Sequence, residues 1–355
     1  MPVVIEIEKE KRPRTFRSNA TMRILIASPI DPPAIHELEQ WHDVVCAFSA
    51  PEEELKKKIR DREVLVFRSG VSLSADVLSS APNLKLIVRA GCGTDNLDLD
   101  YVRARKIAFL RIPEPAAQAV SEMAIAMMLA IARNLREADR LWREGHWVKY
   151  EIEGYVLAGK TLGIVGAGNI GSRLGQLGAA LGMTAIGCVE SPNPAATARL
   201  AEKGIRLTTF DEVVTQSDFI SINVPLSAST RNLINADVLA RVKQGAILVN
   251  LARGGVVNEA ALIKQLQPGG RLRGAGVDVH EQEGEGKISP LAGLPNVVLT
   301  PHIGAMTVDT QREIGRRVVE IMRTFGPSVT VAGPVRTEDG ISGQRIACAG
   351  NPELP

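Results

Sequence analysis

A glycine-rich hexapeptide, Gly-Ala-Gly-Asn-Ile-Gly at 166–171, constrains the fold of this 355-residue chain more than any other feature. It directly follows the apolar run Thr161–Val165 and precedes a helical stretch. A strand that ends in Gly-x-Gly-x-x-Gly and opens into a helix is typical of dinucleotide-binding domains. We expect Gly166 to permit the tight turn, Gly168 to let a pyrophosphate approach the backbone, and Gly171 to let the helix pack closely on the sheet.

Short apolar runs alternate with helix-length segments along most of the chain, a pattern typical of parallel sheets covered by helices. In the first third we expect strands at Arg23–Ala27, Val64–Arg68, Leu84–Arg89 and Ile107–Ile112, and helices at Pro33–Gln40, Pro51–Asp61 and Ser74–Ser80. One long helix is expected from Gln118 to about Arg143. Beyond it we expect about six strands, at Thr161–Val165, Thr184–Val189, Phe219–Val224, Ile247–Leu251, Gly276–Val279 and Val297–Thr300.

The chain is too long for one compact core, so we expect two domains. A final amphipathic helix at about Val308–Phe325 has no strand partner in the second half, so we expect it to pack back on the first domain. The predicted fold class is α/β, with two Rossmann-like or flavodoxin-like domains built on parallel sheets. The expected divisions are an N-terminal extension at 1–21, a discontinuous first domain at 22–117 and 305–333, a dinucleotide-binding domain at 118–304, and a C-terminal tail at 334–355.

Composition argues against several classes of protein. The 42 basic residues nearly balance the 40 acidic ones, which does not favour nucleic-acid binding. No apolar run in the sequence reaches the roughly 20 residues of a membrane span, so no membrane association is expected. The four cysteines, Cys46, Cys92, Cys188 and Cys348, are far apart. Their spacing predicts neither a disulfide framework nor a metal site, and it favours a reducing cytoplasm.

Polar residues follow three of the later predicted strands. Arg253 follows Ile247–Leu251, Glu283 follows the strand at 276–279, and His302 follows the strand at 297–300. Ligands of open α/β sheets bind at the carboxyl ends of the strands, so these side chains are expected to converge there. Each has an alternative explanation taken singly: a surface ion pair, a solvated acid or a turn histidine. Together they suit hydride transfer, with histidine as acid and base, a carboxylate beside it, and arginine on a substrate carboxylate.

Four segments of this chain resemble the D-isomer-specific 2-hydroxyacid dehydrogenases, and the resemblance runs in order from about Met22 to Phe325. The segments are Gly166–Gly171, Asn250–Leu262, Asp278–Glu283 and Thr300–Gly304. Within that family the chain is most similar to the phosphoglycerate dehydrogenases, in Phe67-Arg68-Ser69, in Val88–Asn96 and in Arg253-Gly-Gly.

The resemblance implies that Arg253 binds the substrate carboxylate and carbonyl oxygen, that His302 is the proton donor and acceptor, and that Glu283 orients it. The substrate-binding residues that it implies in the first domain are Arg68, Ser69, Arg89, Gly91, Cys92 and Gly93. The residues that it implies at an NAD cofactor are Gly166, Gly168, Asn169, Ile170, Gly171, Val189, Glu190, Val224, Pro225, Leu251, Ala252, Asp278 and Gly304.

The chain departs from the family pattern at three places. Val189 stands where the family has an acidic residue that binds the ribose hydroxyls. Glu190 follows it directly and could bind the ribose instead. No arginine that could bind a 2′-phosphate lies in 189–193, so the sequence favours NAD over NADP. The segment 113–119 lacks the Asn and Ser common in phosphoglycerate enzymes, which weakens the case for a phosphorylated substrate. His280 and Gly284 stand where the family usually has an aromatic residue and a proline, which predicts a softer loop around Glu283.

The expected function is NAD-dependent interconversion of a D-2-hydroxy acid and its 2-keto acid, with 3-phosphoglycerate as the favoured substrate. Arg68 and Arg89 could bind a second anionic group on the substrate, but either could equally form an interdomain salt bridge. Reduction of hydroxypyruvate, glyoxylate or another 2-keto acid is the alternative, and an NADH-responsive, corepressor-like binding protein is a third reading. The helix from Gln118 resembles the family's dimerising arm, which predicts a homodimer. No C-terminal regulatory domain is recognised, so feedback control by serine through one is not expected.

Overall fold

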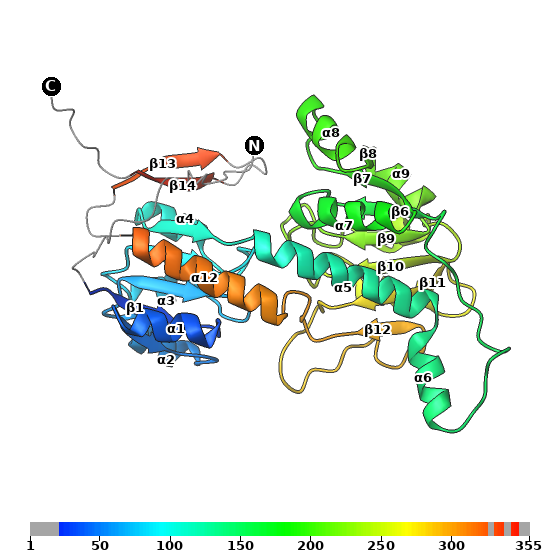
Figure 1. Cartoon of the computed structure of the whole chain (residues 1–355), viewed down its shortest axis with the longest axis horizontal. Helices are drawn as coiled ribbons and strands as arrows, with labels where there is room; N and C mark the ends of the chain where they lie inside the picture. The colour runs from blue at the N-terminus through cyan, green and yellow to red at the C-terminus, as the bar shows by residue number, and fades with distance from the viewer. Residues whose placement is uncertain (1–20, 326–329, 337–341, 348–355) are drawn as a thin grey trace. The chain divides into compact units, whose positions relative to one another are not determined.

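The computed structural model of this chain describes residues 21–325 and the backbone of 330–336 and 342–347. The predicted N-terminal extension lies outside the described residues, apart from Thr21. The chain divides into two compact units, which are treated separately below (Figure 1). The first unit comprises Met1–Pro115 and Val308–Pro355, and the second comprises Ala116–Thr307.

The first unit is built on a five-stranded parallel sheet with the strand order β2-β1-β3-β4-β5. This 2-1-3-4-5 order is that of flavodoxin-like proteins. The strands are β1 (Arg23–Ile26), β2 (Asp43–Cys46), β3 (Val64–Phe67), β4 (Leu86–Arg89) and β5 (Ala108–Arg111). The helices between them are α1 (Pro32–Glu39), α2 (Glu52–Ile59), α3 (Ala75–Ser79) and α4 (Leu99–Ala104).

Two elements between β1 and β5 were not predicted from the sequence, β2 and α4. No residue of β2 is fully buried, because it is an edge strand that pairs with β1 on one side alone. Its apolar run is therefore short. The helix α4 has six residues, too few to show a helical period, and the side chain of Asp98 caps its N-terminus.

The final helix α12 (Val308–Thr324) packs within the first unit, beside α1 (Figure 1). Its buried residues Ile314, Val318 and Met322 belong to the same core cluster as the residues of β1 and β3. A Cβ atom on Gly315 would lie 2.8 Å from the Cβ of Ala34, so glycine lets the two helices approach closely. The first unit is thus discontinuous in sequence.

A two-stranded antiparallel sheet follows α12, formed by β13 (Thr330–Arg336) and β14 (Ser342–Ala347). The C-terminal tail was expected at 334–355. The end of β13 and all of β14 lie in this segment. The remaining residues of that segment, 337–341 and 348–355, lie outside the described part of the chain.

The second unit is built on a seven-stranded parallel sheet with the order β12-β11-β10-β9-β6-β7-β8. Its strands are β6 (Thr161–Val165), β7 (Thr184–Cys188), β8 (Ile205–Leu207), β9 (Phe219–Ile222), β10 (Ala246–Asn250), β11 (Leu272–Val277) and β12 (Val297–Leu299). Numbered from β6, this is the 3-2-1-4-5-6 order of dinucleotide-binding sheets with one further strand. The order reverses between β6 and β9, the point at which such sheets bind their ligands. The expected six strands lacked β8, an edge strand of three residues.

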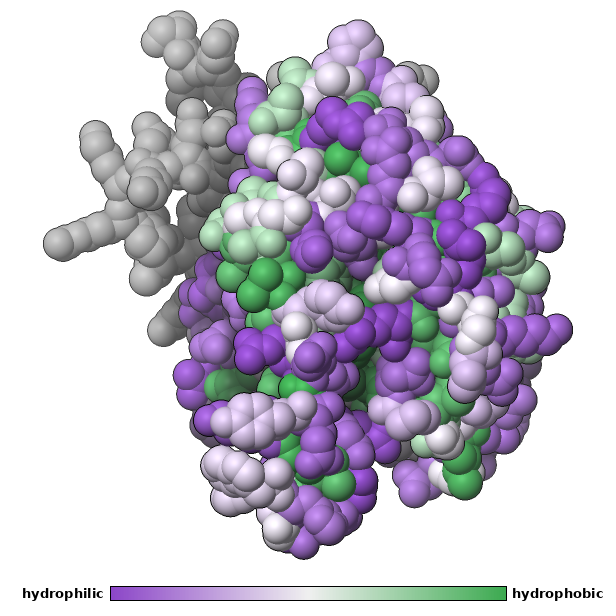
Figure 2. Space-filling view, turned by 90° about the vertical axis from the view of Figure 1, so that its right-hand side faces the viewer, coloured by the Kyte–Doolittle hydropathy of each residue, from purple (hydrophilic) through white to green (hydrophobic). Residues whose placement is uncertain are grey.

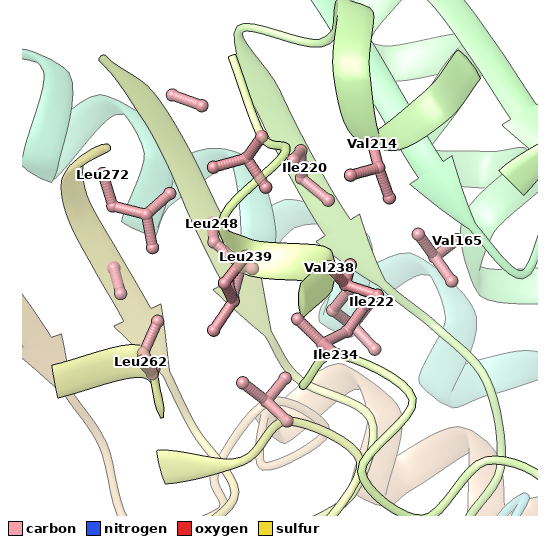
Figure 3. Packing of buried hydrophobic residues seen from close by; sticks show 14 of the residues in the cluster. Val165, Val214, Ile220, Ile222, Ile234, Val238, Leu239, Leu248, Leu262 and Leu272 are labelled. Carbon is pink, nitrogen blue, oxygen red and sulfur yellow. The ribbon is translucent and has the colours of Figure 1, made fainter. Parts of the chain in front are cut away.

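Two hydrophobic clusters cover the faces of this sheet. One joins the strands to α9 (Phe210–Gln216), α10 (Ala236–Leu239) and α11 (Glu259–Leu266), and Figure 3 shows its side chains meeting between strand and helix. The other joins the strands to α7 (Asn169–Ala180), α8 (Pro194–Ala201) and the long helix α5 (Glu114–Ala132).

On the face drawn in Figure 2, hydrophilic residues predominate and hydrophobic ones form small scattered groups.

The expected single helix from Gln118 to Arg143 is in fact two, α5 and α6 (Leu135–Arg143). Asn134 between them has a φ of +50°, a left-handed conformation that ends a helix and that asparagine tolerates. The 19 residues of α5 are long and apolar enough, by length and composition alone, to cross a membrane. However, 56% of that apolar window is buried in the protein, as in a core helix. No residue of α6 is buried, and Trp142 and Trp147 pack edge to face on its exposed end.

Candidate active site

Three neighbouring strands of the second unit deliver the three side chains with predicted catalytic roles. β10, β11 and β12 lie side by side and run parallel. Arg253 follows β10, Glu283 follows β11 and His302 follows β12. The ends of parallel strands lie at one edge of the sheet, so the topology brings the three loops to the same edge.

His302 and Glu283 form a hydrogen-bonded pair. Nδ1 of His302 lies 3.0 Å from Oε2 of Glu283, and the His280 amide donates to Oε1 of the same carboxylate over 3.0 Å. A carboxylate only accepts, so Nδ1 carries a hydrogen and Nε2 is the atom left for a substrate oxygen. The His302 side chain remains 30% exposed, which keeps the ring accessible.

The surroundings of Glu283 favour its ionised form. Partial burial opposes ionisation, but the hydrogen bonds from His302 and from the His280 amide, together with the charges of both rings, prevail. They lower the pKa of Glu283 below its ordinary value. The carboxylate is therefore charged at neutral pH, where it accepts from Nδ1 and orients the imidazole.

The loop of His302 is anchored on Asp278, whose side chain is buried. The Asp278 carboxylate accepts from the Thr300 hydroxyl at 2.5 Å, from the Ile303 amide at 2.8 Å and from the Gly304 amide at 2.9 Å. The resemblance implies that Asp278 lies at the cofactor. In the structure its carboxylate accepts these three bonds from the chain itself and so shapes the turn that presents His302.

The loop of Arg253 is held by its own neighbours. The Asn250 side chain donates to the Arg253 carbonyl at 3.2 Å and accepts from the Ala252 amide at 3.1 Å. Nη1 of Arg253 donates to the Ala252 carbonyl at 2.7 Å, and its side chain is half-buried. A Cβ atom on Gly254 would collide with the His280 carbonyl, so the loops after β10 and β11 touch backbone to backbone.

A pocket of about 550 Å³ opens beside the His302–Glu283 pair, within the second unit. Its lining includes both of these residues with Lys287, Ile288 and Leu299. That volume lies within the range of roughly 300–1,000 Å³ typical of small-molecule sites.

The glycine turn after β6 has the geometry that a dinucleotide requires. Gly166 has a φ of +91°, and a Cβ atom there would lie 2.8 Å from Val224. A Cβ atom on Gly171 would collide with the Gly166 carbonyl, so α7 packs tightly against the strand end. Gly168 differs, because a Cβ atom there would meet nothing within 4 Å. The space lies at the N-terminus of α7, where unpaired N–H groups suit phosphates, so these residues fit a bound dinucleotide.

The other residues implied at a cofactor follow strand ends of the same sheet. Val189 is half-buried and Glu190 is exposed after β7, which leaves the Glu190 carboxylate accessible to a ribose. The remaining members of the implied set lie at the start of α7, after β9 and β10 and after β12: Asn169, Ile170, Val224, Pro225, Leu251, Ala252 and Gly304.

The substrate-binding residues implied by the resemblance lie together at the ends of β3 and β4 in the first unit. Arg68 is buried and donates to the Gln311 side chain at 2.6 Å, while its Nε has no hydrogen-bond partner. Burial lowers the pKa of Arg68, but a guanidinium stays charged at neutral pH. Its side-chain partner in the first unit is thus an amide of α12.

Arg89 is also buried and shapes the neighbouring loop. Its guanidinium lies 5.1 Å from the centre of the Phe67 ring, and its Nε donates to the Gly93 carbonyl at 2.7 Å. A Cβ atom on Gly91 would lie 3.1 Å from Nη1 of Arg89. Of the remaining implied residues, Ser69 is exposed and the Cys92 thiol donates to the Pro113 carbonyl at 3.3 Å.

Reasoning from the sequence assigned no role in the site to His280 or Asn250. Both hold loops that carry the predicted catalytic residues, His280 through Glu283 and Asn250 through Arg253. Asn250 is the last residue of β10. A polar residue at the end of an otherwise apolar strand is the sequence feature that could have indicated its role.

A doubly wound sheet with a glycine turn at its first strand end defines the second unit as a dinucleotide-binding domain. The sequence profile of the D-isomer specific 2-hydroxyacid dehydrogenases, NAD binding domain, matches residues 125–304. The chain belongs to this family.

The relatives include proteins with different names. The chain is 38% identical over 301 residues to the D-3-phosphoglycerate dehydrogenase of Methanocaldococcus jannaschii, covering 84% of this chain and 56% of that protein. It is also 38% identical over 304 residues to the hydroxypyruvate reductase of Thermotoga maritima, covering 85% and 97%. The chain thus spans little more than half the length of the first relative and nearly all of the second.

A solved structure is similar over the same extent. It is that of a D-lactate dehydrogenase from Aquifex aeolicus complexed with NAD and lactic acid. The sequences are 31% identical, and the TM-score is 0.75 over 85% of this chain and 95% of the other.

Proposed function

We propose that this protein interconverts a D-2-hydroxy acid and the corresponding 2-keto acid with NAD as the hydride carrier. The observation that carries the proposal is the 3.0 Å bond between His302 and Glu283 on loops that leave neighbouring strands, beside the loop of Arg253. Proton transfer to or from the substrate oxygen needs a correctly oriented acid–base side chain, and the imidazole held by Glu283 is one.

Each side chain has a defined task in this proposal. In the oxidative direction, Nε2 of His302 takes the hydroxyl proton, and the Glu283 carboxylate stabilises the resulting imidazolium. The Arg253 guanidinium holds the substrate carboxylate and polarises the adjacent carbon–oxygen bond. When bound, NAD supplies the acceptor for the hydride. The space at Gly168 and the N-terminus of α7 would hold its phosphates.

Among substrates we propose 3-phosphoglycerate first. Its support is the pair of buried guanidiniums, Arg68 and Arg89, at neighbouring strand ends of the first unit, together with the relative from M. jannaschii. A second anionic group on the substrate suits such residues. Hydroxypyruvate or glyoxylate is the second candidate. The T. maritima relative, which this chain matches over nearly its full length, supports it, as does the absence of Asn and Ser from 113–119.

We further propose a cytoplasmic homodimer that prefers NAD to NADP. Glu190 after β7 would repel a 2′-phosphate, and no arginine lies in 189–193 to attract one. The exposed aromatic residues of and after α6, including Trp142 and Trp147, are the kind of surface that a second copy covers.

A substrate panel tests the proposal. Hydride transfer is measured with 3-phosphoglycerate, D-glycerate and D-lactate, and in reverse with hydroxypyruvate and glyoxylate, each with NAD and NADP cofactors. The variant His302→Gln is compared with wild type, and His36→Gln, on the exposed surface of α1, is the matched control. We expect one acid to dominate with NAD and the His302 variant to lose activity by about 100-fold or more. Full activity of that variant would refute the role of His302.

A further inference from the structure

His280 lies where the loops of all three predicted catalytic residues meet. Its amide donates to Oε1 of Glu283 over 3.0 Å, and Nε2 of its ring lies 3.1 Å from the Thr300 carbonyl, two residues before His302. Its carbonyl packs against Gly254, directly after Arg253, where a Cβ atom would collide. One residue therefore contacts each of the three loops.

The contacts define which ring nitrogen of His280 carries a hydrogen. The Thr300 carbonyl can only accept, so Nε2 is the donor. The other nitrogen, Nδ1, is buried and has no hydrogen-bond partner. It faces the Glu259 carboxylate, whose Oε1 lies 3.9 Å away.

Glu259, the first residue of α11, has an unusually buried carboxylate, because its side chain is only 8% exposed. Its Oε1 accepts from the Glu281 amide at 2.9 Å, and Oε1 of Glu281 accepts from the Glu259 amide at 3.0 Å. A buried carboxylate is costly unless polar partners stabilise it. Its partners are the Glu281 amide, which donates to it, and the polar ring of His280, which faces it.

We propose that His280 is a positioning residue, whose ring, held between the Thr300 carbonyl and the Glu259 carboxylate, keeps Glu283 and His302 at hydrogen-bonding distance. The proposal rests on the dehydrogenase function proposed above. Glu259 faces the ring from α11, Glu283 accepts from the His280 amide, and Glu281 and His302 are the hydrogen-bond partners of those two carboxylates. The charge of His280 is also among the causes that lower the pKa of Glu283.

Two substitutions separate the contacts of the ring. His280→Phe retains a planar ring but removes both nitrogens. His280→Gln retains an N–H group that can reach the Thr300 carbonyl. The control is His36→Phe, the same exchange on the exposed face of α1. Melting temperature and the Kd for NADH are measured for each variant as controls for folding and cofactor binding, and kcat and KM are then compared.

We expect His280→Phe to lower kcat by about tenfold, because loosening the two loops misplaces the His302–Glu283 pair. The Kd for NADH should stay within about twofold of wild type, because the phosphate-binding turn lies after another strand. His280→Gln should recover most of kcat. The acid limb of kcat/KM should move to higher pH in His280→Phe, because Glu283 loses one of the charges that lower its pKa.

Three results would overturn the inference: a kcat of His280→Phe within twofold of wild type, an unshifted acid limb, or an equal loss of kcat in both variants. Inactivity of wild type with every acid of the panel would instead refute the proposed function. In that event a crystal structure of His280→Phe tests the positioning role. Retention of the 3.0 Å bond between His302 and Glu283 would contradict it.

Discussion

His302 donates its backbone N–H to the carbonyl oxygen of Asp278 over 2.7 Å, and this bond holds a residue whose φ is +56°. A non-glycine residue in the left-handed region is uncommon and costs free energy, so the surrounding structure must compensate. Asp278 does so twice, through its carbonyl and through the carboxylate that accepts the next two amides. The orientation of the predicted proton-transfer residue therefore depends on a buried acid on the neighbouring strand end.

The substitution Asp278→Asn should destabilise the turn that presents His302. An asparagine presents one NH₂ group where the carboxylate accepts from Thr300, Ile303 and Gly304, so at least one donor loses its partner. We expect the free energy of unfolding to fall by about 2 kcal/mol, measured by urea denaturation, with a parallel fall in kcat. The control is Asp237→Asn, an exposed aspartate in α10. Equal stability of the two variants would contradict the anchoring role.

Gly254→Ala tests the contact between the loops of Arg253 and His280. The added methyl group collides with the His280 carbonyl, so the backbone must move. We expect a loss of about 1–3 kcal/mol in stability and a higher KM for the hydroxy acid, because the loop that carries Arg253 shifts. Gly293→Ala is the matched control, since a Cβ atom there meets nothing within 4 Å. If both variants retain the KM of wild type, the two loops are not coupled.

The glycine turn offers a pair of variants with opposite expectations. Gly171→Ala places a methyl group against the Gly166 carbonyl, so it should lower the melting temperature. Gly168→Ala places its methyl group in open space, so folding should be unaffected. That space is where phosphates would approach, so NADH should bind about tenfold more weakly, a loss of about 1.4 kcal/mol. Fluorescence titration with NADH measures this. Unchanged affinity in Gly168→Ala would place the pyrophosphate elsewhere.

The pKa of Glu283 predicts how its contribution to stability depends on pH. Because the folded state holds this pKa below the ordinary value of 4.5, ionised Glu283 stabilises the fold above that pH. The contribution is lost as the pH falls through the folded-state pKa. The difference in melting temperature between wild type and Glu283→Gln should therefore be greatest above pH 4.5 and shrink below it. Because the side chain is 40% exposed, the difference should be small. A difference that grows towards acid pH would contradict this sign.

Most of the fold could be predicted from the sequence, and the two omitted strands of the large sheets, β2 and β8, share a cause. Strands buried on both faces, such as β3 and β10, appear as continuous apolar runs. The edge strands β2 and β8 bury fewer residues, so their runs are too short to recognise. The break at Asn134 was missed because hydrophobic periodicity does not report a single left-handed residue.

The site was predicted in outline. The positions of Arg253, Glu283 and His302 after consecutive strands indicated a common edge of the sheet, which the strand order has. The roles of Asp278 and His280 as anchors were not foreseen. Both depend on hydrogen bonds between loops 20 or more residues apart, which no local pattern records.

By itself the sequence determined where the buried strands lie, where the glycine turn lies and which side chains follow those strand ends. It does so because apolar periodicity and glycine placement are local properties, expressed by neighbours along the chain. The tertiary structure alone decided that Asp278 shapes the turn of His302 and that His280 faces both Thr300 and Glu259. These relationships arise only when separate segments pack together, because the atoms that pair are distant in sequence and meet through the order of the strands.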